Sequence, residues 1–280
     1  MAGEEIYLDY SEPVSQLLTL GECRDIQGWP DYLALGIGPE HTADLIRMVQ
    51  DDELNWADSE SLEVWTPVHA WRALGQLRAE AAVEPLLGLL WRIDVYSDDS
   101  VGEEIPVALG MIGPAAVPKL AEYLAAPQQR LWARVAVAHA LSEVGKRYPE
   151  ARDDCVAALT GTLEGFVHDP TLNGSLISSL VDLEAVEAAP VMEKAFAADC
   201  VELSILGDWE DVQIELGLLE ERQTPAPESI RLPEISPLGP GQQTRITRKP
   251  QSKRERDAQR RRRQKHKQQK REQKKQKKRK

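Results

Sequence analysis

The chain has 280 residues, of which 42% are hydrophobic and 29% charged, so it is long and apolar enough to bury a sizeable core. No apolar run approaches the roughly 18–20 residues that a membrane span needs. The acidic start MAGEEIYLDY differs from the basic and then apolar start of a signal peptide. We therefore expect a cytoplasmic protein that does not enter a membrane.

Cys23, Cys155 and Cys200 lie far apart and form no Cys-x-x-Cys pair, so neither a disulfide framework nor a zinc ribbon is predicted. We interpret them as small buried hydrophobic residues. The five histidines form no His-x-x-x-His or His-Glu-x-x-His pattern. The sequence therefore predicts no metal site and no cofactor.

Charge is divided unevenly along the chain. Residues 245–280 hold 20 Lys and Arg against three acidic residues, a balance of +17, whereas residues 1–244 carry a balance of −29. The net charge of −12 thus combines an acidic body with a basic tail.

The N-terminal part shows short helix signals. Residues 11–21 begin with a serine and a proline that are typical of a helix start, and they finish on a glycine. A second short helix is predicted within residues 29–36, and a third begins near Pro39. We assign residues 1–38 to N-terminal capping helices.

From about residue 59 the hydrophobic pattern repeats. Leu74, Leu109, Leu141 and Leu180 align at spacings of 35, 32 and 39 residues, as in helical-pair solenoids. The residues three and four positions before each leucine share one helix face with it. After a turn, a second apolar helix is predicted at residues 82–91, 115–124, 151–163 and 188–196. One such pair cannot bury its apolar face alone, so stacked neighbours are expected to supply the core.

The segments 73–75 and 108–110 both read Ala-Leu-Gly, and the second helices open with Ala-Val-Glu-Pro at 82–85 and Ala-Val-Pro at 116–118. Over roughly residues 40–200 the chain resembles HEAT-like repeats, in the short bacterial form of the phycobilisome lyases. The resemblance implies an all-α fold, an α-α superhelix of the HEAT-like or armadillo type.

The chain departs from this family at two kinds of position. Family members usually carry an arginine seven residues before the aligned leucine, where it pairs with an aspartate of a neighbouring turn. That position here holds Pro67, Gly102, Arg134 and Asn173, so a continuous Asp–Arg ladder is not expected. Pro67 and Pro106 are also expected to interrupt their helices or to start them late.

The C-terminal quarter changes in composition. Gly207 and Asp208 are expected to start a helix over 210–219 that caps the solenoid, which we place at residues 39–222. Residues 223–244 are rich in Pro and Gly and predict a linker. Residues 245–280 lack aromatic side chains and predict a disordered basic tail.

The resemblance implies that the helices bearing the aligned leucines line a concave surface. Positions two, five and nine before each leucine lie on a second face, away from the core. The candidate partner-binding residues are Trp65, His69, Arg72, Glu104, Trp132 and His139. Trp65 and Trp132 occupy equivalent positions, and they either line a polar groove or pack between repeats.

No nucleophile motif, Walker-type loop or dinucleotide-binding pattern occurs, and the carboxylate pairs, such as Asp51-Asp52, are expected to stabilise helix starts. We predict no catalytic residue. The leading hypothesis is a non-enzymatic scaffold that binds a protein partner on its concave surface. The alternative implied by the resemblance is a phycobilin-lyase-like enzyme or pigment chaperone.

The tail supports a third hypothesis, a nucleic-acid-associated protein that holds RNA or DNA through residues 245–280. Its densest cations are Arg260, Arg261, Arg262, Arg263, Lys265 and Lys267. The tail alternatively contacts an acidic partner, folds back on the acidic body or merely offsets its charge. The charge of the body argues against a HEAT-like DNA glycosylase, which grips the phosphate backbone with a basic concave face.

Overall fold

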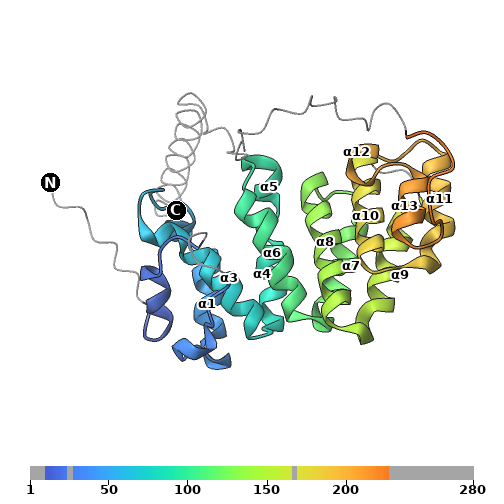
Figure 1. The fold of residues 1–280 in the computed structure, drawn as a ribbon. Helices are drawn as coiled ribbons and strands as arrows, with labels where there is room; N and C mark the ends of the chain where they lie inside the picture. Colours follow the sequence, from blue (N-terminus) through green and yellow to red (C-terminus); the bar gives the residue numbers. More distant parts are fainter. Residues whose placement is uncertain (1–9, 24–27, 166–168, 227–280) are drawn as a thin grey trace, which may run out of the picture. The chain divides into compact units, whose positions relative to one another are not determined.

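A computed structural model of the protein describes residues 10–23, 28–165 and 169–226. These residues form helices joined by turns and loops, with no strand among them (Figure 1), which confirms the all-helical prediction for this part of the chain. No helix in the same three ranges is long and apolar enough to cross a membrane. The predicted linker beyond residue 226 and the basic tail lie outside the described residues.

The N-terminal helices are shorter than the sequence suggests. Two 3-10 helices, η1 (Val14–Thr19) and η2 (Leu33–Leu35), stand where longer helices were expected. Gly21 and Gly36 follow them with φ of 74° and 88°, a left-handed conformation that glycine adopts without strain. The helix expected from Pro39 consists of η3 (Pro39–His41), α1 (Thr42–Gln50) and then α2 (Asp52–Asn55).

Four helices carry the aligned leucines, and their predicted positions are confirmed. They are α3 (Thr66–Gln76), preceded by η4 (Leu62–Trp65), α6 (Asp99–Ile112), α8 (Leu131–Arg147) and α10 (Pro170–Asp182). Successive members of the series α1, α3, α6, α8, α10 and α12 (Leu203–Leu206) contact one another in chain order (Figure 1).

Each of these four helices is followed by a second helix that opens with one 3-10 turn. The pairs of elements are η5 (Glu80–Ala82) with α4 (Val83–Leu87), η6 (Pro114–Ala116) with α7 (Val117–Ala125), η7 (Pro149–Ala151) with α9 (Arg152–Leu163), and η8 (Val186–Ala188) with α11 (Ala189–Ala197). The sequence places all four starts within two residues. One local geometry therefore recurs four times.

The Leu-Gly step explains how neighbouring helices approach. A Cβ added at Gly75 would lie 3.1 Å from the Cα of Ala108 on α6, and one added at Gly110 would lie 2.5 Å from the Cβ of Glu143 on α8. Both glycines directly follow an aligned leucine. A side chain at either position would push the next helix away, so glycine here is a packing requirement.

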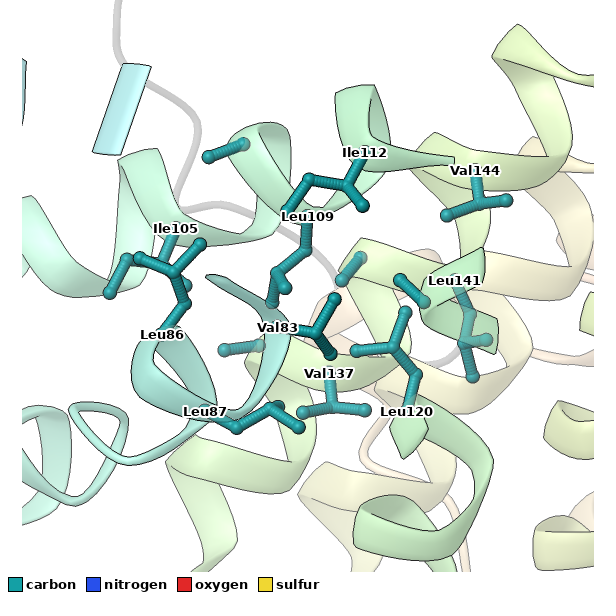
Figure 2. Packing of buried hydrophobic residues seen from close by; sticks show 14 of the residues in the cluster. Val83, Leu86, Leu87, Ile105, Leu109, Ile112, Leu120, Val137, Leu141 and Val144 are labelled. Carbon is teal, nitrogen blue, oxygen red and sulfur yellow. The ribbon is translucent and has the colours of Figure 1, made fainter. Parts of the chain in front are cut away.

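The leucines themselves lie in the core between the two helix layers. Figure 2 shows Leu109, Val137 and Leu141 pointing toward Val83 and Leu120 from the second helices. Leu109 is 1% exposed and the side chains of Leu120 and Leu141 are fully buried. Truncating one such leucine to alanine costs roughly 2–5 kcal/mol.

Two local expectations need correction. The helix expected over 82–91 stops at Leu87, because residues 88–90 turn and a separate helix, α5 (Trp91–Tyr96), follows. Pro67 lies in the first turn of α3, as expected, but α6 runs straight through Pro106. The residue four positions earlier, whose carbonyl faces the proline ring in a regular helix, is Gly102, and glycine adjusts its backbone with the least steric cost.

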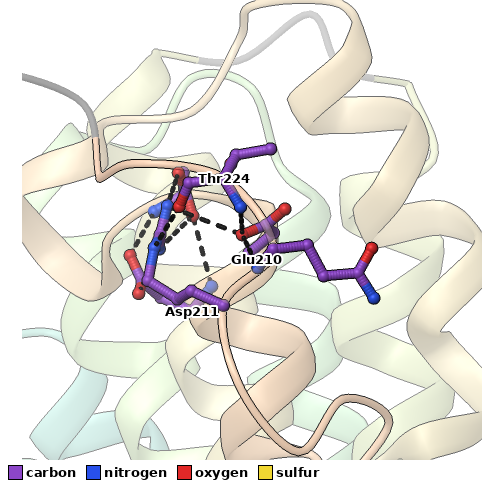
Figure 3. Close-up of polar contacts among 6 residues, drawn as sticks. Glu210, Asp211 and Thr224 are labelled. Carbon is purple, nitrogen blue, oxygen red and sulfur yellow. Dashed lines mark hydrogen bonds and ion pairs between the residues drawn. The ribbon is translucent and has the colours of Figure 1, made fainter.

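The C-terminal helix α13 (Trp209–Glu215) is shorter than the predicted 210–219, because Gly217 adopts a φ of 69°. It contacts α11 and buries Val212. Residues 222–224 return to its N-terminal end (Figure 3). There Arg222 contacts Asp208 at 2.6 Å and Asp211 at 2.5 Å, while Glu210 accepts hydrogen bonds from the backbone amides of residues 223 and 224.

Candidate functional site

The predicted partner-binding residues divide into buried and exposed groups. His69 is fully buried and Arg72 is only 5% exposed, so neither of these predicted partner-binding residues lies at the surface. The reason is that the N-terminal segment covers this face of α3. Sequence spacing placed both residues on the correct helix face but did not show what packs on it.

His69 is held between two groups of that segment. Its Nε2 lies 2.9 Å from the carbonyl oxygen of Gly21, and its Nδ1 lies 2.7 Å from the hydroxyl of Tyr32. Because a carbonyl only accepts, Nε2 carries the proton and Nδ1 accepts from the tyrosine. Burial lowers the pKa of His69, which favours this neutral form. His69 is therefore a structural connector.

Arg72 joins the same segment to the next helix. Its Nε and terminal nitrogen donate to the two carboxylate oxygens of Glu104 at 2.9 and 2.5 Å, and its guanidinium lies 5.1 Å from the ring centre of Trp29. Nearby, Gln76 donates to the carbonyl of Pro30 at 2.7 Å. The predicted residue Glu104, whose side chain is 18% exposed, thus belongs to this packing contact.

The equivalent tryptophans have different environments. Trp65 is partly buried and packs on the core, which agrees with packing inside the stack rather than with lining a polar groove. Trp132, at the same position relative to its leucine, is 48% exposed at the start of α8. On the same helix the side chain of His139 is 46% exposed and lies 3.7 Å from Glu143. Of the six candidates, Trp132 and His139 are the most accessible.

A groove that sequence reasoning missed lies beside α5. We call it the aromatic groove, a hollow of about 410 Å³ lined by the apolar side chains of Leu87, Trp91, Tyr123 and Ala126 and by Gln128 and Gln129. Its volume falls within the usual range of ligand sites. Burial raises the pKa of the Tyr123 phenol, so this side chain remains a hydrogen-bond donor near neutral pH.

The rim of the groove is charged. Lys119 lies 2.9 Å from a carboxylate oxygen of Glu84 and 3.6 Å from one of Glu122. Both carboxylates are largely exposed, at 71% and 74% of their side-chain surface. A second hollow of about 790 Å³ shares Glu84 and Lys119 and continues along the same side of α4 and α7.

The surface next to the groove is apolar. Trp91 and Val95 are 39% and 38% exposed, and their spacing of four residues places them on one face of α5. Asp94 accepts hydrogen bonds from the backbone amides of Trp132 at 3.0 Å and Ala133 at 3.1 Å. This carboxylate holds the first turn of α8 against α5. We refer to Trp91, Val95 and Trp132 as the α5/α8 patch.

Cys155 on α9 does not line the groove. Burial raises the pKa of the Cys155 thiol to about 11, so the reactive thiolate is scarce at neutral pH. Within the described ranges, no three His, Cys, Asp or Glu side chains are arranged to hold a metal ion. Arg134, in the position of the family arginine, donates to the carbonyl of Leu124 at 2.8 Å instead of to an aspartate.

The predicted tail cations, Arg260 to Lys267, lie outside the described residues. In comparisons with known proteins, no family model, no curated protein and no solved structure matches the chain. The only local signal for the groove in the sequence was the Gly88 to Trp91 stretch, where a turn splits the expected second helix and leaves Trp91 at the surface.

Proposed function

We propose that the chain is a non-enzymatic HEAT-like scaffold, an α-α superhelix that binds a protein partner on its helical surface. The fourfold recurrence of helix, 3-10 turn and second helix supports the repeat assignment. The chain-order contacts from α1 to α12 support stacking of the repeats. A cytosolic location remains a prediction from the sequence.

The observation that carries the binding function is the exposure of Trp91 and Trp132 beside a groove. Tryptophan is usually well buried, and when it is accessible it is enriched at the energetic centres of protein interfaces. Trp132 is 48% exposed although its backbone is fixed by Asp94. A rigid, accessible indole loses little conformational freedom when a partner covers it.

Site-specific photo-crosslinking in the full chain tests this proposal. A photo-reactive amino acid replaces Trp132 in one variant and Val186, which is 43% exposed on η8, in the control. We expect one identified protein to crosslink at position 132 and not at position 186. Equal labelling at both positions, or no protein at either, contradicts partner binding at α8.

The charge of the tail supports a second role, electrostatic contact with nucleic acid or an acidic partner. Residues 245–280 carry a balance of +17, enough to bind several phosphates without reading sequence. Changing Arg260, Arg261, Arg262, Arg263, Lys265 and Lys267 to glutamine in the full chain should lower the salt dependence of duplex binding. The expected decrease in the log–log slope is at most about 5. An unchanged slope contradicts this role.

Phycobilin attachment remains the enzymatic alternative implied by the resemblance. It is tested by mixing the chain with phycocyanobilin and an apo-phycobiliprotein and following absorption and covalent colour. If pigment is attached faster than in a mixture without the chain, phycobilin attachment replaces the purely scaffolding proposal. No acceleration leaves binding as the function to be tested.

A further inference from the structure

We infer that the aromatic groove and the α5/α8 patch together dock an extended, cationic peptide segment of a partner protein, one that carries an apolar anchor residue. This inference rests on the proposed scaffold function and adds the chemistry of the bound segment. It also moves the binding surface from α3, where the sequence pointed first, to the side formed by α4, α5, α7 and the start of α8.

The apolar lining of the groove is preorganised. The ring of Trp91 lies 5.3 Å from the ring of Tyr96, which in turn lies 5.0 Å from Trp56. These contacts hold the indole in place while leaving 39% of Trp91 accessible. An apolar side chain bound beside Leu87 and Trp91 would gain burial without ordering the receptor.

The groove is also suited to a peptide backbone. Gln128 and Gln129 line it, and each carboxamide has both donor and acceptor atoms for main-chain groups. The hollow shares the lining residues Glu84 and Lys119 with the second one, and two adjacent hollows favour an extended occupant over a compact small molecule. The α5/α8 patch provides a further apolar contact at Val95.

The charge on the rim selects a cationic segment. Glu84 and Glu122 share the single ammonium of Lys119, which leaves an excess negative charge at the opening. The described residues as a whole carry 37 acidic and 12 basic side chains. Such a field speeds the approach of a basic segment and disfavours pairing of two such bodies.

An arginine on the segment would find a second partner in the face of Trp91. The chain already places guanidinium groups over aromatic rings, with Arg92 at 5.4 Å from the centre of Trp56 and Arg78 at 5.2 Å from that of Tyr148. A cation over the face of an indole is attracted by the negative charge of the ring's π electrons. The aromatic lining and the acidic rim thus favour the same ligand chemistry.

The test is a selection of random-sequence peptides displayed on phage against the full chain, followed by affinity measurements with the selected peptides. We expect a consensus that combines Arg or Lys with one aliphatic or aromatic residue. Trp91→Ala should weaken the binding of these peptides about tenfold or more. Glu122→Lys should weaken peptide binding about threefold to tenfold. Because position 122 is exposed, this variant should keep the fold. Val186→Ser is the matched exposed control and should leave affinity within about twofold.

Three results overturn the inference. They are an acidic or uncharged consensus, equal binding of cationic peptides to the wild type and Glu122→Lys, and a dimer of the full chain that Trp91→Ala dissociates. The last result would mean that a second copy covers the groove. If partner crosslinking at position 132 persists while the peptide selection fails, the peptide chemistry is wrong and the scaffold function stands. Failure of both removes the scaffold function as well.

Discussion

Equivalent positions relative to the aligned leucines are buried on α3 and exposed on α8. Relative to their leucines, Trp65 on η4 just before α3 matches Trp132, and Arg72 matches His139. On α3 the N-terminal segment covers the face, and Arg72 is 5% exposed. On α8 no comparable segment among the described residues covers Trp132 or His139, whose side chains are roughly half exposed. Register decides which way a side chain points, and neighbouring segments decide whether it reaches solvent.

The two faces also use polar groups differently. On α3 each polar atom of His69 has a fixed partner, so the cost of burial is offset by hydrogen bonds. On α8 the side chain of His139 is 46% exposed, and the largely buried carboxylate of Glu143 contacts Lys146 and Arg147. We therefore expect substitutions at His69 and Arg72 to affect stability and those at the exposed Trp132 and His139 to affect binding.

The largest expected effect is at Arg72. Arg72→Ala leaves the partly buried carboxylate of Glu104 without its partner and removes the contact with Trp29. The free energy of unfolding should fall by about 3 kcal/mol, the lower end for breaking a buried ion pair. Urea titration at pH 7 measures the change. The matched variant His139→Ala should change stability by less than about 0.5 kcal/mol. Similar losses in both variants would contradict the contrast between the faces.

A pH-dependent effect is expected at His69. Burial lowers its pKa in the folded protein, so below the ordinary value of about 6.5 the unfolded chain binds the proton more readily. The stability from this group is complete above about pH 6.5 and is lost as pH falls, by at most about 1.4 kcal/mol per pH unit. His69→Gln should flatten the slope between pH 7 and 5.5. An identical slope in the variant would mean that His69 takes up no proton on unfolding.

A smaller effect is expected at Glu143 on α8. Hydrogen bonding from His139 lowers the pKa of its carboxyl group, and the nearby Lys146 and Arg147 lower it further, although burial opposes these effects. Glu143→Gln should reduce stability by about 1 kcal/mol at pH 7, because the cluster is partly exposed. A group with a lowered pKa stabilises the fold above its ordinary value of 4.5, so the difference should shrink as pH falls below 4.5. Thermal unfolding at pH 7 and pH 3.5 compares the two conditions.

The smallest effect on folding is expected at Trp132. Because the side chain is 48% exposed and Asp94 binds only its backbone amide, Trp132→Ala should change the unfolding free energy by less than about 0.5 kcal/mol. The same variant should weaken binding of the selected cationic peptides, as measured by fluorescence anisotropy. A large loss of stability would mean that Trp132 belongs to the core, as Trp65 does.

Much of the helix pattern could be predicted because local signals decide it. The aligned leucines, the Leu-Gly steps and the Ala-Val-Pro type openings are properties of a few adjacent residues, and the corresponding helices lie where expected. The break after Leu87 was missed because the apolar run from 86 to 91 suits one helix as well as two. Whether the stacked helices form a superhelix remains a prediction.

The candidate site was predictable only in part. Trp132 and His139 were found from register alone, and both are accessible. The burial of His69 and Arg72 depends on Tyr32 and Trp29, which are about 40 residues away in sequence and carry no periodic signal. The aromatic groove likewise joins α4, α5 and α7 with the turn before α8, a juxtaposition that only the tertiary structure reveals.

The clasp at Arg222 has a mechanical consequence. Arg222 grips Asp208 and Asp211 at the beginning of α13, and Glu210 holds the backbone amides of Gln223 and Thr224. A pull on the chain beyond residue 226 is therefore transmitted to the first turn of α13 through parallel ion pairs and hydrogen bonds. Bonds that share a load in parallel resist it better than bonds opened one after another.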